Sequence, residues 1–381
     1  MQRNEFDVLV IGEGLSGITA AAAACAQGAH LMLASKGPGT FILGTACVDL
    51  DGLELALSGV NHCGRNEVEE SIRFFLELTA AAGCAYEGGV QEHRLVPTIM
   101  GTFAQVSLAP RQLWKGDPRG VGRAVVVGIE NVFAFNAKFV AERLSDHSKD
   151  RGIATLYRAA AIQLAPIGER RWLTPLDVAA EIDRNPSYRE ALVASLKRVA
   201  HDADLLILPG VLGLDSDDER MRCFEDDIGC AICELPTLPP SVPGLRLLRR
   251  LESHLAAKGA EICTGFSIQN LCLEGDHCTG AILDTPGKPR TVRAASVILA
   301  SGKFSHLPGG GTAEAQSSAH GIVGEGLRAV NAQGAVLARN VFECGSVLGK
   351  FESRFGNAIA IVSGYQAGVL ACRQGVQYAR A

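Results

Sequence analysis

A glycine-rich turn close to the N-terminus constrains the fold of this chain more than any other feature. The stretch FDVLVIGEGLSGITAAAAACAQGAHLMLASKG runs from Phe6 to Gly37. The β-branched run 7–11 predicts a buried parallel strand, the alanine-rich run to about Gln27 predicts a helix, and 30–34 predicts a second strand. This order is the opening βαβ unit of a Rossmann-like α/β domain.

The turn Gly12-x-Gly14-x-x-Gly17 suits a bound phosphate. The first glycine permits the tight turn, the second lets the backbone approach a pyrophosphate, and the third lets helix and strand pack closely. The helix N-terminus then presents free N–H groups and a positive dipole end to the anion. The turn predicts a nucleotide site, and the alternative is a packing turn in a Rossmann-like domain that has lost its ligand.

The second strand lacks the acidic residue that normally closes such a fingerprint. Ala34, Ser35 and Lys36 stand where an Asp or Glu would bind the adenosine ribose. Either the adenosine is held differently, with Lys36 nearby, or there is no adenosine because the cofactor is FMN. The glycine geometry favours FAD, whereas the missing acid favours FMN.

Composition excludes several classes of protein. With 381 residues, of which 47% are hydrophobic and 20% charged, the chain can bury a sizeable core in one or two domains. A net charge of -5 gives no basic patch for nucleic acid. The 12 cysteines are scattered, the apolar runs are too short to span a bilayer, and we expect no signal peptide. We therefore expect a cytoplasmic protein.

The later pattern predicts a discontinuous domain. Residues 1–62 and 244–381 form the Rossmann-like flavin-binding domain, and residues 63–243 form an inserted second α/β domain. The segment Pro236–Pro243 holds four prolines and is expected to be an extended, helix-free connection. The elements expected in the second half of the flavin domain are a helix at 245–258, strands at 261–268, 270–274, 278–284, 296–300 and 341–344, and a helix at 358–373.

Glycines at the ends of the later strands point to a flavin rather than a nicotinamide. Ser301-Gly302 follows one strand and Gly345-Ser346 follows another. The helix after Gly356 would direct its N-terminus at the pyrimidine end of the flavin ring, where its positive end stabilises the reduced form. The alternative is that these are ordinary strands of a large α/β domain.

Four longer stretches resemble one known family. ELPTLPPSVPGLRLLRRLE, LLILPGVLGL, AVVVGIENVFAFNAKFVAERL and NVFECGSVLGKF are similar to the B subunit of anaerobic glycerol-3-phosphate dehydrogenase. The resemblance covers most of the chain. It implies a flavoprotein that uses FMN and works with an FAD-containing subunit and an iron–sulfur subunit that passes electrons to membrane quinone. Contact with the inner face of the membrane is then expected only through these partners.

Three segments depart from the family pattern. Lys350 and the run 354–358 replace a glycine- and cysteine-rich turn, and the stretch 306–318 is shorter. Phe103 to Val106 replace a basic and hydroxyl cluster, and they are poor phosphate ligands. These departures count against glycerol 3-phosphate as the ligand of this chain. The chain would then belong to a related complex that acts on another hydroxy acid or polyol.

Other candidate sites are weaker. Cys230-x-x-Cys233, with Cys223 nearby, is interpreted as buried structural thiols because a second pair is missing. The acidic runs 215–219 and 225–227 are interpreted as a solvated loop or a partner-docking face. No metal site is predicted at His62-Cys63 or at 276–278, and the catalytic base is unknown, with His93 and His306 as weak candidates.

The prediction is therefore a flavin-binding subunit of a multi-subunit anaerobic dehydrogenase, with FMN slightly favoured and FAD as the alternative. A self-contained flavin oxidoreductase acting on a small hydroxy compound and a flavin-free scaffold subunit remain as alternatives. The residues expected to bind the cofactor are Gly12, Glu13, Gly14, Leu15, Ser16, Gly17, Ser35, Lys36, Thr45, Ala46, Ser301, Gly302, Gly345, Ser346, Asn357 and Ala358.

Overall fold

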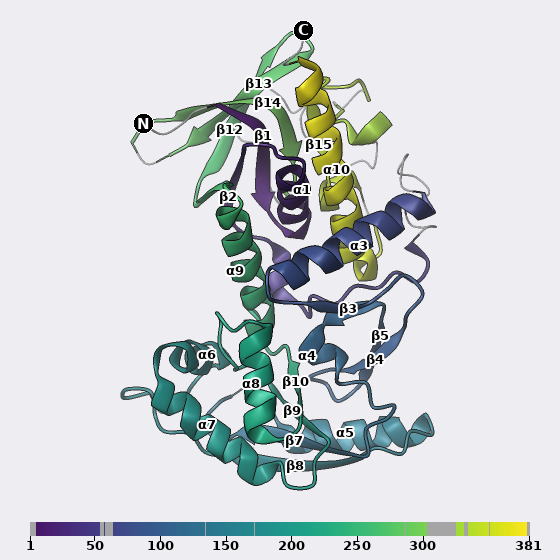
Figure 1. The fold of residues 1–381 in the computed structure, drawn as a ribbon, viewed down its shortest axis with the longest axis vertical. Coiled ribbons are helices and arrows are strands. Elements are labelled where there is room, and N and C mark those ends of the chain that lie inside the picture. Colours follow the sequence, from purple (N-terminus) through teal and green to yellow (C-terminus); the bar gives the residue numbers. More distant parts are fainter. Residues whose placement is uncertain are drawn as a thin grey trace. The chain divides into compact units, whose positions relative to one another are not determined.

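The computed structural model describes residues 5–378 apart from 54–56, 58–63, 134, 171, 286, 303–324, 331–333 and 350. The chain divides into two units, which Figure 1 shows coloured along the sequence. The terminal unit comprises Met1–Thr40, Asp49–Leu78 and Leu251–Ala381, and the central unit comprises Phe41–Val48 and Thr79–Arg250. The predicted boundaries at 62/63 and 243/244 remain a proposal for the folding domains.

A mixed sheet forms the centre of the terminal unit. Its strand order is β11-β2-β1-β14-β13-β12, with β15 also paired to β14. The strands are β1 (Glu5–Glu13), β2 (Leu31–Pro38), β11 (Glu261–Thr264), β12 (Ser267–Glu274), β13 (His277–Asp284), β14 (Arg290–Leu299) and β15 (Val341–Glu343).

Strand β14 joins two kinds of sheet. Its first half pairs antiparallel with β13, and its second half pairs parallel with β15. On its other side it runs parallel to β1, which in turn runs parallel to β2. The parallel part therefore brings the carboxyl ends of β1, β2, β14 and β15 to one edge, where ligands bind in open α/β sheets.

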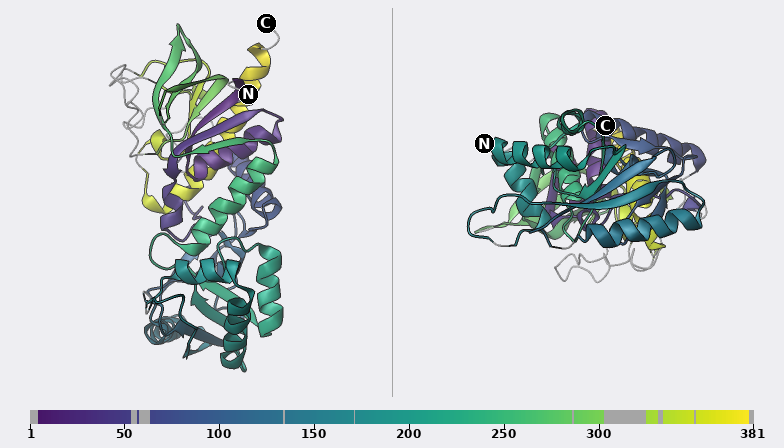
Figure 2. Two further views of the ribbon diagram at one scale, coloured as in Figure 1. Left: turned by 90° about the vertical axis from the view of Figure 1, so that its left-hand side faces the viewer. Right: turned by 90° about the horizontal axis from the view of Figure 1, so that it is seen from below.

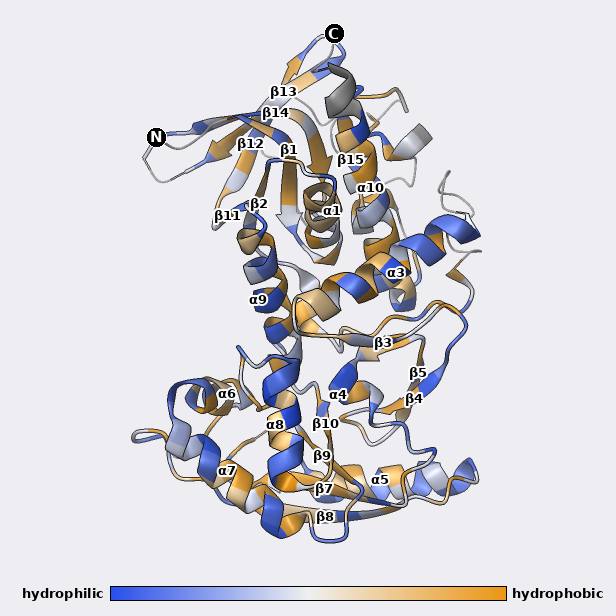
Figure 3. Cartoon of the chain, in the orientation of Figure 1, coloured by the Kyte–Doolittle hydropathy of each residue, from blue (hydrophilic) through white to orange (hydrophobic). Residues whose placement is uncertain are grey.

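Two apolar helices cover this parallel part. Helix α1 (Leu15–Ala26) is buried on all sides from residue 15 to residue 24, and the hydropathy colours of Figure 3 mark it as largely apolar. It packs against α10 (Gly356–Tyr378), where a side chain at Gly364 or Gly368 would overlap a backbone carbonyl of α1. Small residues thus let the two helix backbones approach closely.

Helix α10 is the one helix in the described part of the chain that is long and apolar enough to cross a membrane. However, 61% of its most apolar window is buried inside the protein. Burial against α1 and β14 is what a core helix shows, so its length alone gives weak support for a membrane span.

The central unit is a three-layer structure around a parallel sheet of order β10-β9-β7-β8. One face packs against α6, α7 and α8, and the opposite face packs against α4 and α5, as Figure 2 shows from below. The sheet strands are β7 (Arg123–Ile129), β8 (Leu156–Ile162), β9 (Leu205–Pro209) and β10 (Ala231–Leu235). The helices are α4 (Arg111–Trp114), α5 (Ala137–Asp150), α6 (Pro175–Arg184), α7 (Pro186–Val199) and α8 (Asp218–Ile228).

Two short ladders complete the central unit. β3 (Tyr86–Gly88) pairs with β6 (Leu108–Pro110), and β4 (Arg94–Pro97) pairs with β5 (Phe103–Val106). Helices α3 (Arg65–Ala81) and α9 (Val242–Ala257) contain two of the boundaries between the two units, and the other two fall at 40/41 and 48/49.

Two sequence-based predictions about local structure are wrong. The proline-rich connection is not helix-free to its end, because α9 begins at Val242 and holds Pro243 in its first turn, where a missing N–H costs nothing. The acidic run 225–227 is not a loop, because it lies in α8. Its Glu225 carboxylate lies 2.6 Å from Lys115 Nζ, which compensates the charge of a largely buried acid.

Candidate functional site

The glycine turn between β1 and α1 is held by close backbone packing. Gly12 has a φ of +117°, and a side chain there would overlap the carbonyl of Ala300 at the end of β14. A side chain at Gly17 would overlap the carbonyl of Gly12. These two positions require glycine for the fold itself, whether or not a ligand is bound.

Gly14 differs from its two neighbours in the motif. It is the N-cap residue of α1, with an extended backbone and no side-chain hydrogen bond to the helix. A Cβ built at Gly14 would meet no atom within 4 Å, so the fold does not need glycine there. No acidic residue lies in the first turn of α1. The open space and the uncapped N–H groups of Leu15, Ser16 and Gly17 fit a phosphate.

The end of β2 holds a buried acid that comes from β1. Ser35 is buried in β2, whereas Lys36 is exposed. Ser35 Oγ donates to Glu13 Oε2 at 2.7 Å, and Thr264 Oγ1 of β11 lies 3.1 Å from Glu13 Oε1. Glu13 was expected only as part of the turn, and Thr264 was not expected at all. Thr264 ends β11, the strand that pairs with β2, and this position was the signal that could have pointed to it.

The ends of β14 and β15 meet the start of α1. Ala300 N donates to the carbonyl of Ile11 at 2.8 Å, which brings Ser301 and Gly302 beside the turn. A side chain at Gly345 would overlap Ser16, and a Cβ at Gly302 would lie 3.8 Å from Ser346 Oγ. The structure therefore brings together the predicted residues of these three segments.

One residue that sequence reasoning missed supports this arrangement. Ser363 Oγ of α10 accepts a hydrogen bond from Gly345 N at 2.8 Å. It thereby ties the loop after β15 to the helix that starts with Asn357 and Ala358, the last two predicted residues. Ala358 is buried and Asn357 is half-buried.

The bulky residues before α10 contact the protein itself. Arg354 Nε donates to Glu352 at 2.8 Å, and its Nη1 lies 3.5 Å from Asp49. Phe355 is buried in the unit, beneath the Arg354 guanidinium. Lys350 and the run 306–318 lie outside the described residues.

Thr45 and Ala46 belong to the central unit. Thr45 is exposed, and the Ala46 carbonyl accepts a hydrogen bond from Tyr86 at 2.9 Å. Their role in cofactor binding therefore stays a prediction.

Cys344 beside the candidate site and Cys233 of the CxxC pair are buried thiols, whereas Cys230 is half-buried. Burial raises the pKa of Cys344 to about 12, against a smaller opposite effect of the Ser16 hydrogen bond. Burial likewise raises the pKa of Cys233 far above its usual value, and that of Cys230 less. Among the described residues no group of three or more His, Cys, Asp or Glu could hold a metal ion.

The structure does not identify a catalytic base. His93 is exposed in the central unit, where its carbonyl accepts from Arg119 Nη2 at 3.0 Å. His62, Cys63 and His306 lie outside the described residues.

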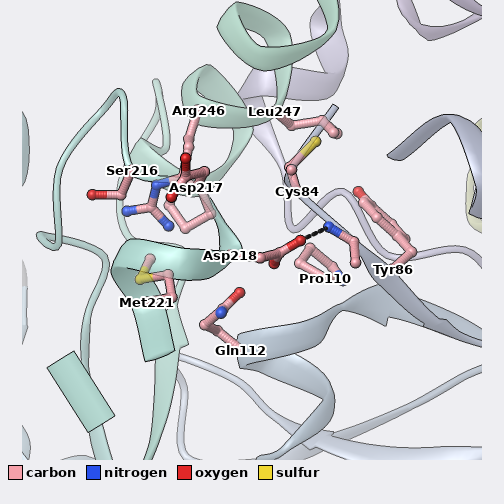
Figure 4. A pocket seen from close by; sticks show the side chains of 13 residues that line it. Cys84, Tyr86, Pro110, Gln112, Ser216, Asp217, Asp218, Met221, Arg246 and Leu247 are labelled. Carbon is pink, nitrogen blue, oxygen red and sulfur yellow. Dashed lines mark hydrogen bonds between the residues drawn. The ribbon is translucent and has the colours of Figure 1, made fainter. Parts of the chain in front are cut away.

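Hollows also occur in the described part of the central unit, and the first is lined by Tyr86, whose hydroxyl donates to the carbonyl of Ala46. Figure 4 shows the first, a cavity of about 30 Å³ beside the hydrogen bond from Ala85 N to Asp218. That volume holds about one water molecule. The second is a groove of about 380 Å³ lined by both charged and apolar residues of α7 and α8.

Sequence comparisons show which known proteins the chain resembles. The family described as "FAD binding domain" matches residues 242–346, which include Ser301, Gly302, Gly345 and Ser346. The B subunit of anaerobic glycerol-3-phosphate dehydrogenase from Pectobacterium atrosepticum is 29% identical over 78% of this chain and 75% of its own length. The chain is thus similar to that B subunit over most of its length. A probable B subunit of the same enzyme from Halobacterium salinarum is also 29% identical, over 73% of this chain and 68% of its own length.

Solved structures give lower similarity. Thermovibrio ammonificans THI4 covers 99% of this chain and 91% of its own, with 8% identity and a TM-score of 0.38. The 3-ketosteroid delta1-dehydrogenase of Sterolibacterium denitrificans has 16% identity and a TM-score of 0.36 over 79% of this chain. This chain spans 48% of that dehydrogenase.

The B-subunit relatives and the matched family confirm the predicted resemblance, the α/β fold with a Rossmann-like flavin-binding domain, and the assignment to the flavin-dependent oxidoreductases. They support a flavin cofactor but give no support to the slight preference for FMN.

Proposed function

We propose that this chain is the flavin-binding subunit of a multi-subunit dehydrogenase and relays electrons between a partner's flavin or a substrate and iron–sulfur centres that lead to quinone. The observation that carries the proposal is the uncapped N-terminus of α1, with open space at Gly14 and the ends of β14 and β15 beside it. The names of the B-subunit relatives support a place in such a complex.

The chain's own residues would bind and orient the cofactor. The N–H groups of Leu15, Ser16 and Gly17 hold the phosphate, and the first turn of α10 at Asn357 and Ala358 directs a positive helix end at the ring. A bound flavin can accept two electrons together and pass them on one at a time. The buried, protonated Cys344 thiol adds no competing redox group at this edge of the sheet.

The finer features of the proposal follow from the sequence. FMN is favoured by the missing acid of β2, and FAD by the glycine turn. The partners are an FAD-containing dehydrogenase subunit and an iron–sulfur subunit, in the cytoplasm or against the inner face of the membrane through them. A self-contained oxidoreductase and a flavin-free scaffold subunit are the alternatives.

The deciding experiment is a visible spectrum of the purified chain with its co-expressed partners, followed by heat release and chromatography of the cofactor. We expect flavin absorption bands. Their absence from an intact complex would leave only the scaffold function. Flavin that a small hydroxy compound reduces without any partner subunit would instead establish the self-contained enzyme.

Gly14→Val tests the location of the site. The side chain fits the empty space but occupies the place of the phosphate, so we expect loss of flavin from a folded protein. Ala26→Val is the matched control, since it adds the same side chain at the exposed far end of α1. Equal flavin content in both variants would place the cofactor elsewhere.

A further inference from the structure

We propose that Glu13 replaces the acid that β2 lacks, and that its carboxylate binds the 2′- and 3′-hydroxyls of an adenosine ribose, so that the flavin is FAD. The inference rests on the proposed function, because it takes a flavin at the glycine turn as given. It names a residue on β1, whereas the acid of the usual fingerprint ends β2.

The side chain of Glu13 reaches the carboxyl end of β2. Glu13 is the last residue of β1, and a register irregularity before it places it opposite Pro38 of β2. Its carboxylate reaches Ser35 on β2 and Thr264 on β11. An acid from β1 therefore lies at the carboxyl end of β2, the place where a ribose-binding acid is needed.

The Glu13 carboxylate can accept more hydrogen bonds than its partners in the described part of the chain donate. A carboxylate offers about four acceptor positions. In the described part of the chain its partners are two hydroxyl groups, those of Ser35 and Thr264, and it has no Lys, Arg or His partner. Only 2% of Glu13 is exposed, and a buried carboxylate is costly unless its acceptors are used. A neutral diol supplies two further O–H donors, which an anionic phosphate does not.

Ser35 fits the same interpretation. Its hydroxyl donates to Glu13 at 2.7 Å, so it holds the carboxylate in position. An acid at residue 35 would place a second negative charge against Glu13, which would disfavour ionisation of one of them. The serine at the end of β2 and the glutamate at the end of β1 are therefore two parts of one arrangement.

Access to Glu13 requires a local shift. The segment Gly37–Gly39 lies against it, with Gly39 N donating to the Glu13 carbonyl at 3.2 Å. A Cβ at Gly37 would meet nothing within 4 Å, whereas one at Gly39 would overlap Gly14 Cα, so the shift has to occur at Gly37 rather than at Gly39. The ribose diol can reach the Glu13 carboxylate only after the segment Gly37–Gly39 has moved.

The test titrates cofactor-free protein with FAD, FMN and an FAD analogue whose adenosine ribose is 2′,3′-dideoxy, with calorimetry as the readout. We expect the wild type to bind FAD at least about tenfold more tightly than the dideoxy analogue, because hydrogen bonds to a charged group are among the stronger ones. This comparison needs no variant, so it decides the matter even if a substitution at Glu13 prevents folding.

Glu13→Gln then assigns the effect to the side chain. The amide keeps the size of the carboxylate but loses its charge and one acceptor group, so the preference for FAD over the dideoxy analogue should fall to within about twofold. Thr264→Val, which removes a positioning donor, should lower the preference less. Circular dichroism shows whether both variants fold.

The outcomes separate the two proposals. Binding of FMN alone, or equal affinity for FAD and its dideoxy analogue, would overturn the role of Glu13 and leave the proposed flavin-binding function intact. Failure to bind any flavin would overturn both.

Discussion

Helix α1 of the terminal unit and four helices of the central unit begin in opposite ways. In the central unit α5, α6, α7 and α8 each start at a polar residue whose side chain accepts a backbone N–H three residues later. These N-cap residues are Asn136, Thr174, Asn185 and Asp217. In the terminal unit α1 starts at Gly14, which has no side chain that could accept a hydrogen bond from the first backbone N–H groups. The first turn of α1 also contains no acidic residue.

This difference separates a structural helix terminus from one open to a ligand. The first N–H groups of every helix lack partners within the helix, and a polar N-cap side chain satisfies one of them. In the central unit a cap side chain satisfies one of these groups in each of α5, α6, α7 and α8. The terminal unit leaves the first N–H groups of α1 uncapped beside open space, at the edge where the parallel strands β1, β2, β11, β14 and β15 end, and this is why the proposed function is placed there.

The largest expected effect comes from Gly17→Val. The added side chain would overlap the Gly12 carbonyl, so strand and helix must separate. We expect the terminal unit to lose about 3 kcal/mol of stability, the upper end of the usual cost of overpacking. Urea unfolding followed by circular dichroism measures it. A stable variant that merely lacks flavin would show that Gly17 serves the ligand and not the fold.

Gly14→Asp converts α1 into a helix of the central-unit type. The aspartate can cap the N–H groups and repels a phosphate, so we expect loss of flavin while thermal stability stays equal or rises by a few tenths of a kcal/mol, about the difference between Gly and Asp caps. Cofactor content and melting temperature are measured on the same sample. Retention of flavin would remove the contrast between the two kinds of terminus.

Asn136→Ala tests one of the helices whose N-terminus is capped by a side chain. Its Oδ1 accepts from Phe139 N at 3.0 Å, and loss of this bond should cost about 1 kcal/mol with flavin content unchanged. Asn136→Gly is the control and should cost only a few tenths of a kcal/mol. A loss of flavin in either variant would mean that the central-unit helix also serves the cofactor.

The smallest effect concerns pH. Burial would raise the pKa of Asp177 in the α6 capping box, but hydrogen bonds from Thr174 and the charge of Arg170 lower it below its usual value of 3.8. The ionised carboxylate therefore stabilises the folded chain above pH 3.8, and this contribution is lost as the pH falls through the lowered pKa. Unfolding of wild type and Asp177→Asn across this range should show their difference shrinking at acid pH. A constant difference would contradict the lowered pKa.

Much of the fold was predictable because each unit follows local rules. The run 7–11, the glycine turn and the alanine-rich helix were recognised from residue order alone, and so were the later strands and α10. Two predictions failed for different reasons. The acid Glu225 lies in α8 and is paired with Lys115, 110 residues away, a contact that the local sequence does not reveal. Pro243 lies in the first turn of α9, where a proline is tolerated, and the proline-rich run was wrongly extended through it.

The sequence by itself determined that strand, glycine turn and helix form a nucleotide-binding opening, because spacing and residue size set the backbone path. It also showed that β2 ends without an acid. Only the tertiary structure decided where Glu13 lies. Parallel pairing of β11, β2 and β1 brings Thr264 and Ser35 to the Glu13 carboxylate, although Thr264 is 251 residues away. Side-chain meetings across strands depend on register, which no local pattern in one chain specifies.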